Sequence, residues 1–224
     1  MKIIARIHTD YKEKFGIPRQ SGIADLSVGR IIFEPEYRVP EALRGIEGYS
    51  HLWLIWEFSE AKRENWSPTV RPPRLGGNKR VGVFATRAPY RPNPIGLSSV
   101  RLLAVEHDKT MGDTLLVSGA DMLDGTPIYD IKPYLKYTDS HPDAVSGFAD
   151  DVLGMGLRAV VPDELLCILP DEKKRTLITI LEGDPRPHYK NDPDYIYGMR
   201  YSDYEIKFKV KDGILTVVDI IKAI

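Results

Sequence analysis

The first 150 residues of this chain are divided into short apolar runs by turn-forming residues, and this pattern limits the folds open to it. Lys2 to His8, Ile31 to Phe33 and His51 to Phe58 all have the length of strands. The sequence shows no sustained alternation of strands and helices and no GxGxxG loop of a dinucleotide-binding unit. Short strands in this arrangement favour a barrel or a sandwich over a doubly wound sheet.

A proline-rich stretch, VFATRAPYRPNPIGL, interrupts this pattern from Val83 to Leu97. The apolar run that leads into it predicts a buried strand through Ala85, and three prolines then fix the backbone of a stiff, extended loop. The loop carries two cations, Arg87 and Arg91. A rigid loop that holds two cations beside a buried strand suits an anionic ligand, although a plain rigid turn also explains the prolines.

Positive charge is concentrated in the same part of the chain. The net charge is −1, but the residues from Lys62 to Arg101 include nine lysines or arginines and one acid, Glu64. This segment therefore has a net charge of +8 and the remainder −9. A basic surface on an acidic body indicates selective RNA contact, because neutralised phosphates release counterions while the acidic remainder disfavours indiscriminate binding. A solvated loop that is merely basic is the alternative.

The long loop from Ala61 to Lys79 is predicted to contact RNA together with the residues that follow it. A loop of this length without secondary structure of its own is usually functional or disordered. The predicted contacts are Arg71, Arg74, Lys79, Arg80 and Arg91. Trp66 either stacks on an unpaired base or packs beneath the loop, and we favour packing.

Length and composition are those of an ordinary globular protein. The 224 residues suffice for one domain and a small appendage, and 42% of them are hydrophobic. The sequence has neither an apolar run of about eighteen residues nor a secretory signal, so we expect a cytoplasmic protein with no membrane contact. Cys167 is the single cysteine, which excludes a disulfide within one chain, and we expect it in the core.

From Val161 onward the pattern changes to two short helical segments followed by three strands. Lys211-Asp212-Gly213 joins the last two strands, and Asp-Gly between alternating apolar residues is a strong hairpin signal. Ser140 to Gly156, with one proline and three glycines, is predicted to be a linker. We therefore expect one unit at residues 1–145 and a second at residues 157–224.

Five motifs, found in the same order, resemble one family of RNA-modifying enzymes. They are the segment Asp10 to Gln20, VRPPRLGGN, FATRAPYRPNPIGLS, DMLDGTPIYDIKPY and DPRPHY, which together extend over nearly the whole chain. The sequence is similar to the single-barrel tRNA methyltransferases, which use S-adenosylmethionine to methylate N6 of threonylcarbamoyladenosine at position 37. The resemblance implies a mainly β fold, with a single-sheeted β-barrel N-terminal domain and a small α+β C-terminal domain. It also implies a homodimer that acts on the tRNA anticodon loop.

The resemblance further implies a cofactor pocket built from several segments. Its residues would be Pro18, Arg19, Gln20, His51, Leu52, Arg87, Leu97, Leu123, Asp124, Gly125, Thr126 and Pro127. Methyl transfer to an exocyclic nitrogen is an in-line displacement that needs no metal and no protein nucleophile, but a nearby base would help. Asp130 and Tyr134 are the candidates for this catalytic base, with Asp124 in reserve. Each is equally explained as a hydrogen-bonded structural group.

Other readings of the sequence stay open. A non-catalytic RNA-binding or S-adenosylmethionine-sensing protein on the same barrel is the alternative function. A hydrolase is disfavoured because the sequence has no GxSxG or HExxH motif, and its five histidines lack metal-ligand spacing. The role of DPRPHY is also open: Arg186, held between two prolines, either faces RNA or packs the small domain against the barrel.

Overall fold

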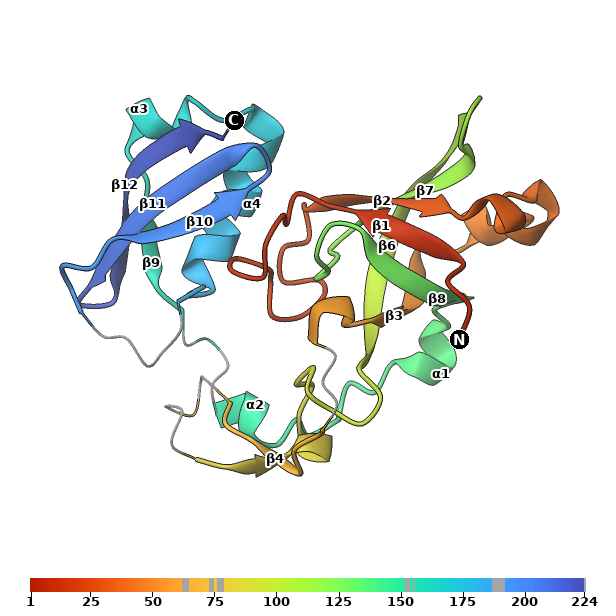
Figure 1. The fold of residues 1–224 in the computed structure, drawn as a ribbon, viewed down its shortest axis with the longest axis horizontal. Helices are drawn as coiled ribbons and strands as arrows, with labels where there is room; N and C mark the ends of the chain where they lie inside the picture. Colours follow the sequence, from red (N-terminus) through yellow and green to blue (C-terminus); the bar gives the residue numbers. More distant parts are fainter. Residues whose placement is uncertain are drawn as a thin grey trace.

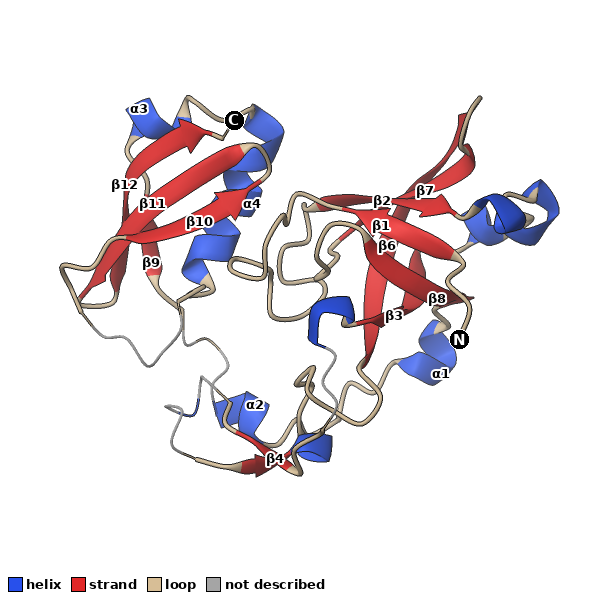
Figure 2. Cartoon of the chain, viewed as in Figure 1, coloured by secondary structure: helices blue, strands red, loops and turns tan. Residues whose placement is uncertain are grey.

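The computed structural model describes residues 1–61, 65–72, 75, 79–151, 154, 156–186 and 192–223. Two strand-rich parts lie side by side, and a smaller lobe that carries β4 lies below them in the view of Figure 1. Figure 2 shows that strands dominate both large parts. The predicted mainly β class is therefore confirmed.

Six strands of the N-terminal part form a closed antiparallel barrel. In chain order they are β1 (Ala5–His8), β2 (Val28–Phe33), β3 (His51–Glu57), β6 (Ile95–Asp108), β7 (Gly112–Ser118) and β8 (Thr126–Pro133). Around the barrel the order is β1-β2-β7-β6-β3-β8, and the pairing of β1 with β8 closes it. Closure removes the edges that an open sheet would expose. The barrel is confirmed, and the sandwich is excluded.

Alternate side chains of the barrel strands point inward to one apolar core. In β3, Leu52, Leu54 and Trp56 are buried, whereas the residues between them are half-buried. The apolar run of this strand is typical of a strand buried on both faces, and that prediction is wrong. The outward-facing Trp53 is instead shielded by Tyr134, whose ring centroid lies 5.5 Å from its own.

The proline-rich stretch begins outside the barrel, in the smaller lobe. There β5 (Val81–Gly82) pairs with β4 (Thr69–Val70). The strand predicted through Ala85 ends earlier, because Val83–Ala85 forms a 3-10 turn, η6. Thr86 closes this turn with two hydrogen bonds to the Val83 carbonyl, from its backbone N–H at 3.2 Å and from its hydroxyl at 2.9 Å.

Short helical turns connect the barrel strands and follow β8. They are η1 (Pro35–Tyr37), η2 (Pro40–Leu43), η3 (Ile46–Gly48), η4 (Ser59–Ala61), α1 (Lys136–Asp139) and α2 (Phe148–Asp151). Prolines begin η1 and η2, where a backbone N–H would have no partner within the helix. Because α2 lies within the predicted linker, that segment is not wholly irregular. Among the described residues we find no apolar helix with the length that a membrane span requires.

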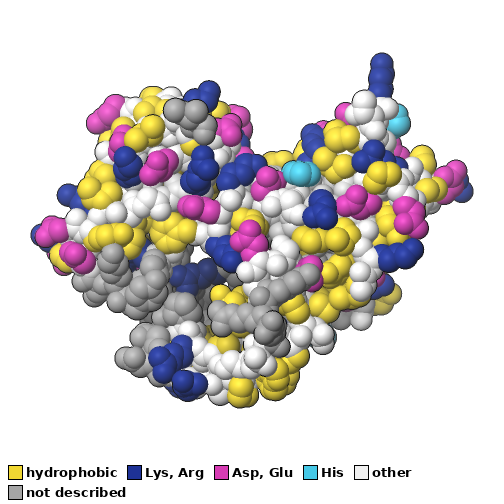
Figure 3. Space-filling model, in the orientation of Figure 1, with side chains coloured by type: hydrophobic (Ala, Val, Ile, Leu, Met, Phe, Trp, Pro, Cys, Tyr) yellow, Lys and Arg dark blue, Asp and Glu magenta, His cyan; other side chains and the backbone are white. Residues whose placement is uncertain are grey.

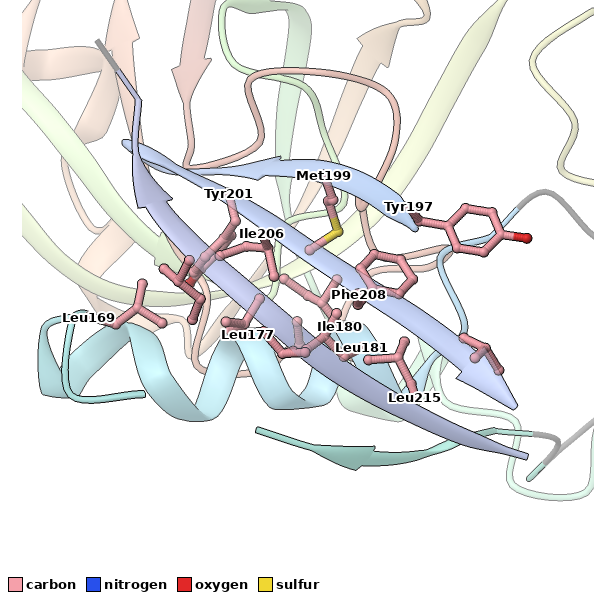
Figure 4. Packing of buried hydrophobic residues seen from close by; sticks show 14 of the residues in the cluster. Leu169, Leu177, Ile180, Leu181, Tyr197, Met199, Tyr201, Ile206, Phe208 and Leu215 are labelled. Atoms are coloured by element: carbon pink, nitrogen blue, oxygen red, sulfur yellow. The ribbon is translucent and has the colours of Figure 1, made fainter. Parts of the chain in front are cut away.

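The C-terminal part packs a helix against a four-stranded sheet. Its elements are β9 (Arg158–Val160), α3 (Asp163–Leu166), α4 (Asp171–Glu182), β10 (Tyr197–Tyr201), β11 (Tyr204–Lys211) and β12 (Ile214–Lys222), with sheet order β10-β11-β12-β9. Leu177 and Leu181 of α4 pack with Phe208 of the sheet, as Figure 4 shows. The predicted hairpin is confirmed, because Asp212 and Gly213 both have positive φ, as a two-residue turn between twisted strands requires.

Residues 9–26 leave the barrel and pack on the C-terminal part. Tyr11 is buried in the same apolar cluster as the core residues of α4 and β11. The Ser202 amide donates to the Asp10 carbonyl at 2.8 Å, and Lys173 Nζ pairs with the Asp10 carboxylate at 2.6 Å. This segment therefore joins the two parts of the molecule, and it also carries three of the predicted cofactor residues.

Candidate active site

A pocket of about 530 Å³ opens where residues 14–20, the proline-rich stretch and the barrel strands β3 and β6 meet. Trp56, Tyr90 and Leu97 are among its apolar and aromatic lining, and Arg19 and Arg87 are among its cations. A concave site of this volume, mostly apolar with a few charged groups, is typical of a small-molecule pocket.

The pocket brings together predicted residues that are far apart in the sequence. Seven of the twelve predicted cofactor residues line it: Pro18, Arg19, Gln20, Arg87, Leu97, Leu123 and Thr126. Arg91, predicted to contact RNA, lines it as well. The barrel therefore places the N-terminal segment, the proline-rich stretch and the turn before β8 around one cavity.

The other five predicted cofactor residues lie away from the described lining of the pocket: His51, Leu52, Asp124, Gly125 and Pro127. Leu52 and Pro127 are buried. His51 begins β3, where its Nδ1 lies 2.9 Å from Ser50 Oγ. The Gly125 carbonyl accepts a hydrogen bond from Arg6 at 3.2 Å.

The Asp124 carboxylate is bound by residues at the start of the chain. It accepts a hydrogen bond from the Thr9 amide at 3.0 Å, lies 3.2 Å from His8 Nδ1 and pairs with Lys12 Nζ at 2.8 Å. Burial raises the pKa of Asp124, but the hydrogen bonds from Lys12 and Thr9 outweigh it, so the pKa lies below its ordinary value. Asp124 thus ties the turn before β8 to the N-terminal segment.

We expect Asp124→Asn to lower the free energy of unfolding at neutral pH by about 1–3 kcal/mol, because it removes the ion pair with Lys12 and weakens the bond from Thr9. The folded-state pKa is lowered, so the carboxylate stabilises the fold above the ordinary pKa of about 3.9 and stops doing so as pH falls through the lower folded value. Urea unfolding at neutral and strongly acidic pH measures this. The difference from the parent protein should shrink in acid, and a constant difference would contradict the assignment.

Asp130 and Tyr134, the first candidates for the base, also lie outside the described lining of the pocket. Asp130 pairs with Lys132 at 3.0 Å. The Tyr134 ring centroid lies 6.1 Å from that of His51 and 5.5 Å from that of Trp53. The structure therefore places Tyr134 against His51 and Trp53, and Trp53 itself lines the pocket.

Asp121, which the sequence analysis did not select, is a carboxylate of the pocket lining. Ser98 Oγ donates to it at 2.6 Å, and Trp56 Nε1 donates to Ser98 Oγ at 2.9 Å. Burial raises the pKa of Asp121, although the Ser98 hydrogen bond and the charge of Arg87 oppose this rise. Trp56 and Ser98 thus form a chain of hydrogen bonds from the barrel core to Asp121, and this chain holds a carboxyl group with a raised pKa in the pocket.

The two arginines of the proline-rich stretch have different partners. Arg87 Nη1 donates to Gln20 Oε1 at 2.5 Å, which links this stretch to the N-terminal segment across the pocket. Arg91 Nη1 donates to the Thr86 carbonyl at 3.0 Å and therefore braces its own loop. The prolines and Arg91 together hold Arg87 in place.

The start of the DPRPHY motif packs against the wall of the pocket. Arg186 and Asp184 form a largely buried pair, with Nε to Oδ1 at 2.9 Å and Nη2 to Oδ2 at 3.0 Å. The Asp184 carbonyl accepts a hydrogen bond from Arg19 Nη2 at 2.8 Å. Arg186 also lies over the Tyr197 ring, 6.0 Å from its centroid, so it packs within the C-terminal part, and Asp184 makes the contact with Arg19. Packing of the small domain against the barrel by Arg186 stays a prediction, and residues 187–189 of the motif lie outside the described residues.

Three of the five predicted RNA contacts lie on the smaller lobe, whereas Arg91 lines the pocket. Arg71, Lys79 and Arg80 are exposed there, and Arg74 lies outside the described residues. Trp66 is 50% exposed, so the prediction that it packs beneath the loop is wrong. The lobe therefore presents both positive charge and an aromatic surface.

Two smaller expectations concern cysteine and metal. Cys167 is exposed at the end of α3, so the expectation that it lies in the core is wrong. Within the part of the chain that the structure describes, His, Cys, Asp and Glu side chains form no group of three that could hold a metal ion.

Comparisons with known proteins match both parts of the chain. The family model of the tRNA-methyltransferase O N-terminal domain matches residues 6–140, and that of the TrmO C-terminal domain matches residues 169–223. The tRNA (adenine(37)-N6)-methyltransferase of Escherichia coli (strain K12) is 39% identical over 218 residues, which are 94% of this chain and 92% of that protein.

Two matches from Pseudomonas aeruginosa extend the comparison. A putative S-adenosylmethionine-dependent methyltransferase, RcsF, is 38% identical over 97% of this chain and 95% of its own length. The crystal structure of TrmO from Pseudomonas aeruginosa superposes with a TM-score of 0.76 at 33% identity, covering 98% of this chain and 97% of that one. Together with the barrel and its pocket, these matches show that the chain belongs to the TrmO (tRNA-methyltransferase O) family.

Proposed function

We propose that this protein transfers the methyl group of S-adenosylmethionine to N6 of adenosine 37 in tRNA, in its threonylcarbamoyl form. The observation that carries the proposal is the convergence of Pro18 to Gln20, Arg87, Leu97, Leu123 and Thr126 on one pocket. Relatives that match nearly the whole chain have names that state a tRNA adenine-37 methyltransferase or an S-adenosylmethionine-dependent methyltransferase.

The chemical groups of the pocket fit S-adenosylmethionine. Arg19 and Arg87 are placed to pair with its carboxylate, and the rings of Trp56 and Tyr90 offer apolar surface for adenine. The bound cofactor supplies an electrophilic methyl group on a sulfonium. The protein then has to align the acceptor nitrogen with that methyl group and accept one proton.

Asp121 is our proposed proton acceptor. A base assists this reaction because the acceptor nitrogen of threonylcarbamoyladenosine lies between a purine ring and a carbonyl, which delocalise its lone pair. Asp121 lines the pocket, and burial raises its pKa, so it is a stronger base than an exposed carboxylate. Ser98 donates to one carboxylate oxygen and fixes the orientation of the group.

The substrate nucleotide lies in a single-stranded loop, so its base can be splayed out and read at modest cost. We propose that Arg71, Lys79 and Arg80, together with Arg74, contact phosphates of that loop. Arg91, which lines the pocket, would approach the substrate there. These contacts would make tRNA binding strongly dependent on salt concentration.

We further propose a cytoplasmic homodimer, since the tRNA substrate is cytoplasmic and a dimer is expected from the resemblance. Exposed apolar residues on β6, Leu97 and Leu103, offer a surface for the second copy. The chain would comprise a barrel unit at 1–145 and a C-terminal unit at 157–224. The barrel strands and the C-terminal elements have separate apolar clusters, which supports two units, and Tyr11 and Ala24 of the first unit belong to the C-terminal cluster.

Arg87→Ala should weaken S-adenosylmethionine binding by about tenfold or more, because it removes a charge-assisted contact and releases Gln20 from its position in the pocket wall. Isothermal titration calorimetry with the purified protein measures this. Arg80→Ala is the matched control: it removes an equal charge from the smaller lobe and should leave cofactor affinity unchanged. An equal loss in both variants would point to bulk charge and not to this pocket.

The alternative, a non-catalytic protein that binds the same cofactor, makes a different prediction. Such a protein retains S-adenosylmethionine without forming S-adenosylhomocysteine in the presence of tRNA. The methyltransferase names of the relatives favour the enzyme.

A further inference from the structure

Two exposed aromatic rings lie together on the smaller lobe. Trp66 and Phe84 have ring centroids 5.9 Å apart and an interplanar angle of 28°, so they are stacked. Trp66 is 50% exposed and Phe84 is 72% exposed. Since each ring can cover only one face of the other, the pair presents an apolar aromatic surface to solvent.

Backbone pairing holds the two rings in register. The segments that carry them are joined by β4 and β5, in which Thr69 pairs with Gly82 and Val70 pairs with Val81. The Val83 amide also donates to the Pro68 carbonyl at 2.9 Å. The aromatic surface is therefore preorganised, and a ligand that binds it would pay little for ordering the two side chains.

The surrounding charge specifies an anionic ligand. From Asn65 to Arg101 the sequence has seven lysines or arginines and no acid. Arg71, Lys79 and Arg80 are exposed on the same lobe, and Figure 3 shows Lys and Arg side chains at its lower left. Stacking rings beside clustered cations are the combination that binds single-stranded nucleic acid, whose bases stack while its phosphates pair with the cations.

The stacked pair of Trp66 and Phe84 is close to the pocket along the chain. Phe84 belongs to η6, and Thr86, two residues later, already lines the pocket. Two residues span at most about 7 Å, so a base stacked on Phe84 would be near a base held in the pocket. That separation suits a nucleotide that neighbours the methylated one.

We propose that Trp66 and Phe84 form a stacking platform for an unpaired base of the RNA substrate, adjacent to the nucleotide that enters the pocket. This inference rests on the proposed function, because it takes the ligand to be the anticodon loop. The platform would add a contact with a base to the phosphate contacts proposed for the lysine and arginines of the smaller lobe. It would therefore determine which nucleotides the protein accepts beside the methylated one.

The test measures affinity for a synthetic anticodon stem-loop at one fixed salt concentration, without S-adenosylmethionine. Trp66→Ala and Phe84→Ala should each weaken binding by about tenfold, the lower range for loss of one base stack. Trp66→Phe should retain affinity, whereas Trp66→Leu, which keeps an apolar side chain without a ring, should behave like Trp66→Ala. Unchanged circular dichroism and thermal melting show that the variants are folded.

A second series removes one base at a time from the stem-loop. At the stacked position, the abasic RNA should bind the parent protein about tenfold more weakly, and Trp66→Ala should then cause no further loss. Equal losses for Trp66→Ala at every abasic position, or full affinity of Trp66→Leu, would overturn the platform. A change of oligomeric state in Trp66→Ala would also overturn it, since the rings would then contact a second copy.

These outcomes are separable from failure of the proposed function. Methylation by the parent protein is measured independently of stem-loop binding. A parent protein that methylates tRNA while all ring variants bind RNA normally refutes the platform and leaves the proposed function standing. Loss of RNA binding in the ring variants of a parent protein that does not methylate tRNA would refute the function and keep only the stacking of Trp66 and Phe84 on an RNA base.

Discussion

Asp121→Asn will lower the turnover number for methyl transfer by about 100-fold or more, the range associated with loss of a general base, while affinity for S-adenosylmethionine changes little. The amide is nearly the same size and can still accept the hydrogen bond from Ser98, so the pocket keeps its shape. It cannot take a proton from the acceptor nitrogen. Single-turnover kinetics at saturating cofactor and tRNA, with calorimetry for cofactor binding, measure the two effects separately.

The pH dependence of the methyl-transfer rate distinguishes a catalytic from a structural role of Asp121. Only the ionised carboxylate can accept a proton, so the rate should fall as pH drops through the pKa of Asp121, which lies above its ordinary value of about 3.9. This acidic limb should disappear in Asp121→Asn.

Asp130→Asn is the matched comparison, because Asp130 is a base candidate from sequence that pairs with Lys132 outside the described pocket lining. A large loss of turnover in Asp130→Asn with little in Asp121→Asn would reverse our assignment. Loss of cofactor binding in Asp121→Asn would instead make Asp121 a cofactor ligand.

Gly96→Ala will destabilise the protein by about 3 kcal/mol and lower its melting temperature by about 10 °C. A β-carbon at Gly96 would lie 2.2 Å from Cε2 of the Trp56 ring, and real β-carbons do not approach so closely. Trp56 cannot move aside easily, since it is buried, donates to Ser98 and lies 4.3 Å from the Phe58 ring, centroid to centroid. Replacing a strand glycine with alanine normally stabilises a protein by about 0.5–1 kcal/mol, which is too little to offset this overlap.

Gly82→Ala is the control for Gly96→Ala. Gly82 also lies in a strand, but nothing lies within 4 Å of a β-carbon built on it, and its φ of −58° suits alanine. The melting temperature of the Gly82→Ala protein should equal that of the parent protein or be slightly higher. A Gly96→Ala protein that melts with the parent would show that the Trp56 side of the pocket is loosely packed. In Gly96→Ala the affinity for the cofactor should fall together with the stability, because Gly96 and Trp56 both line the pocket.

Local patterns in the sequence predicted most of the strands but not how they assemble. The β11–β12 hairpin followed from Asp212 and Gly213, because a two-residue turn depends on neighbouring residues alone. Barrel closure depends on the pairing of β1 with β8, in which Ala5 meets Ile128, and no local signal encodes that contact. The periodicity of the sequence therefore did not distinguish a barrel from a sandwich, and only the family resemblance predicted the barrel.

The same distinction explains the site. The motifs identified Arg87, Gln20 and Leu97, which meet at the pocket only after the barrel has formed. Asp121 lies in the connection between β7 and β8, and it was missed because its importance comes from burial and from Ser98 on β6. Its position between the buried Ala120 and Met122 was the available signal, since an acid within an apolar run needs a partner.

Mass spectrometry of tRNA nucleosides tests the central claim most directly. Purified protein would be incubated with S-adenosylmethionine and tRNA that bears threonylcarbamoyladenosine, with Arg87→Ala in parallel. We predict that one methyl group is gained on that nucleoside and that the gain is lost or strongly reduced with Arg87→Ala. Retention of S-adenosylmethionine on the protein without any methylated nucleoside would contradict the account and favour the non-catalytic alternative.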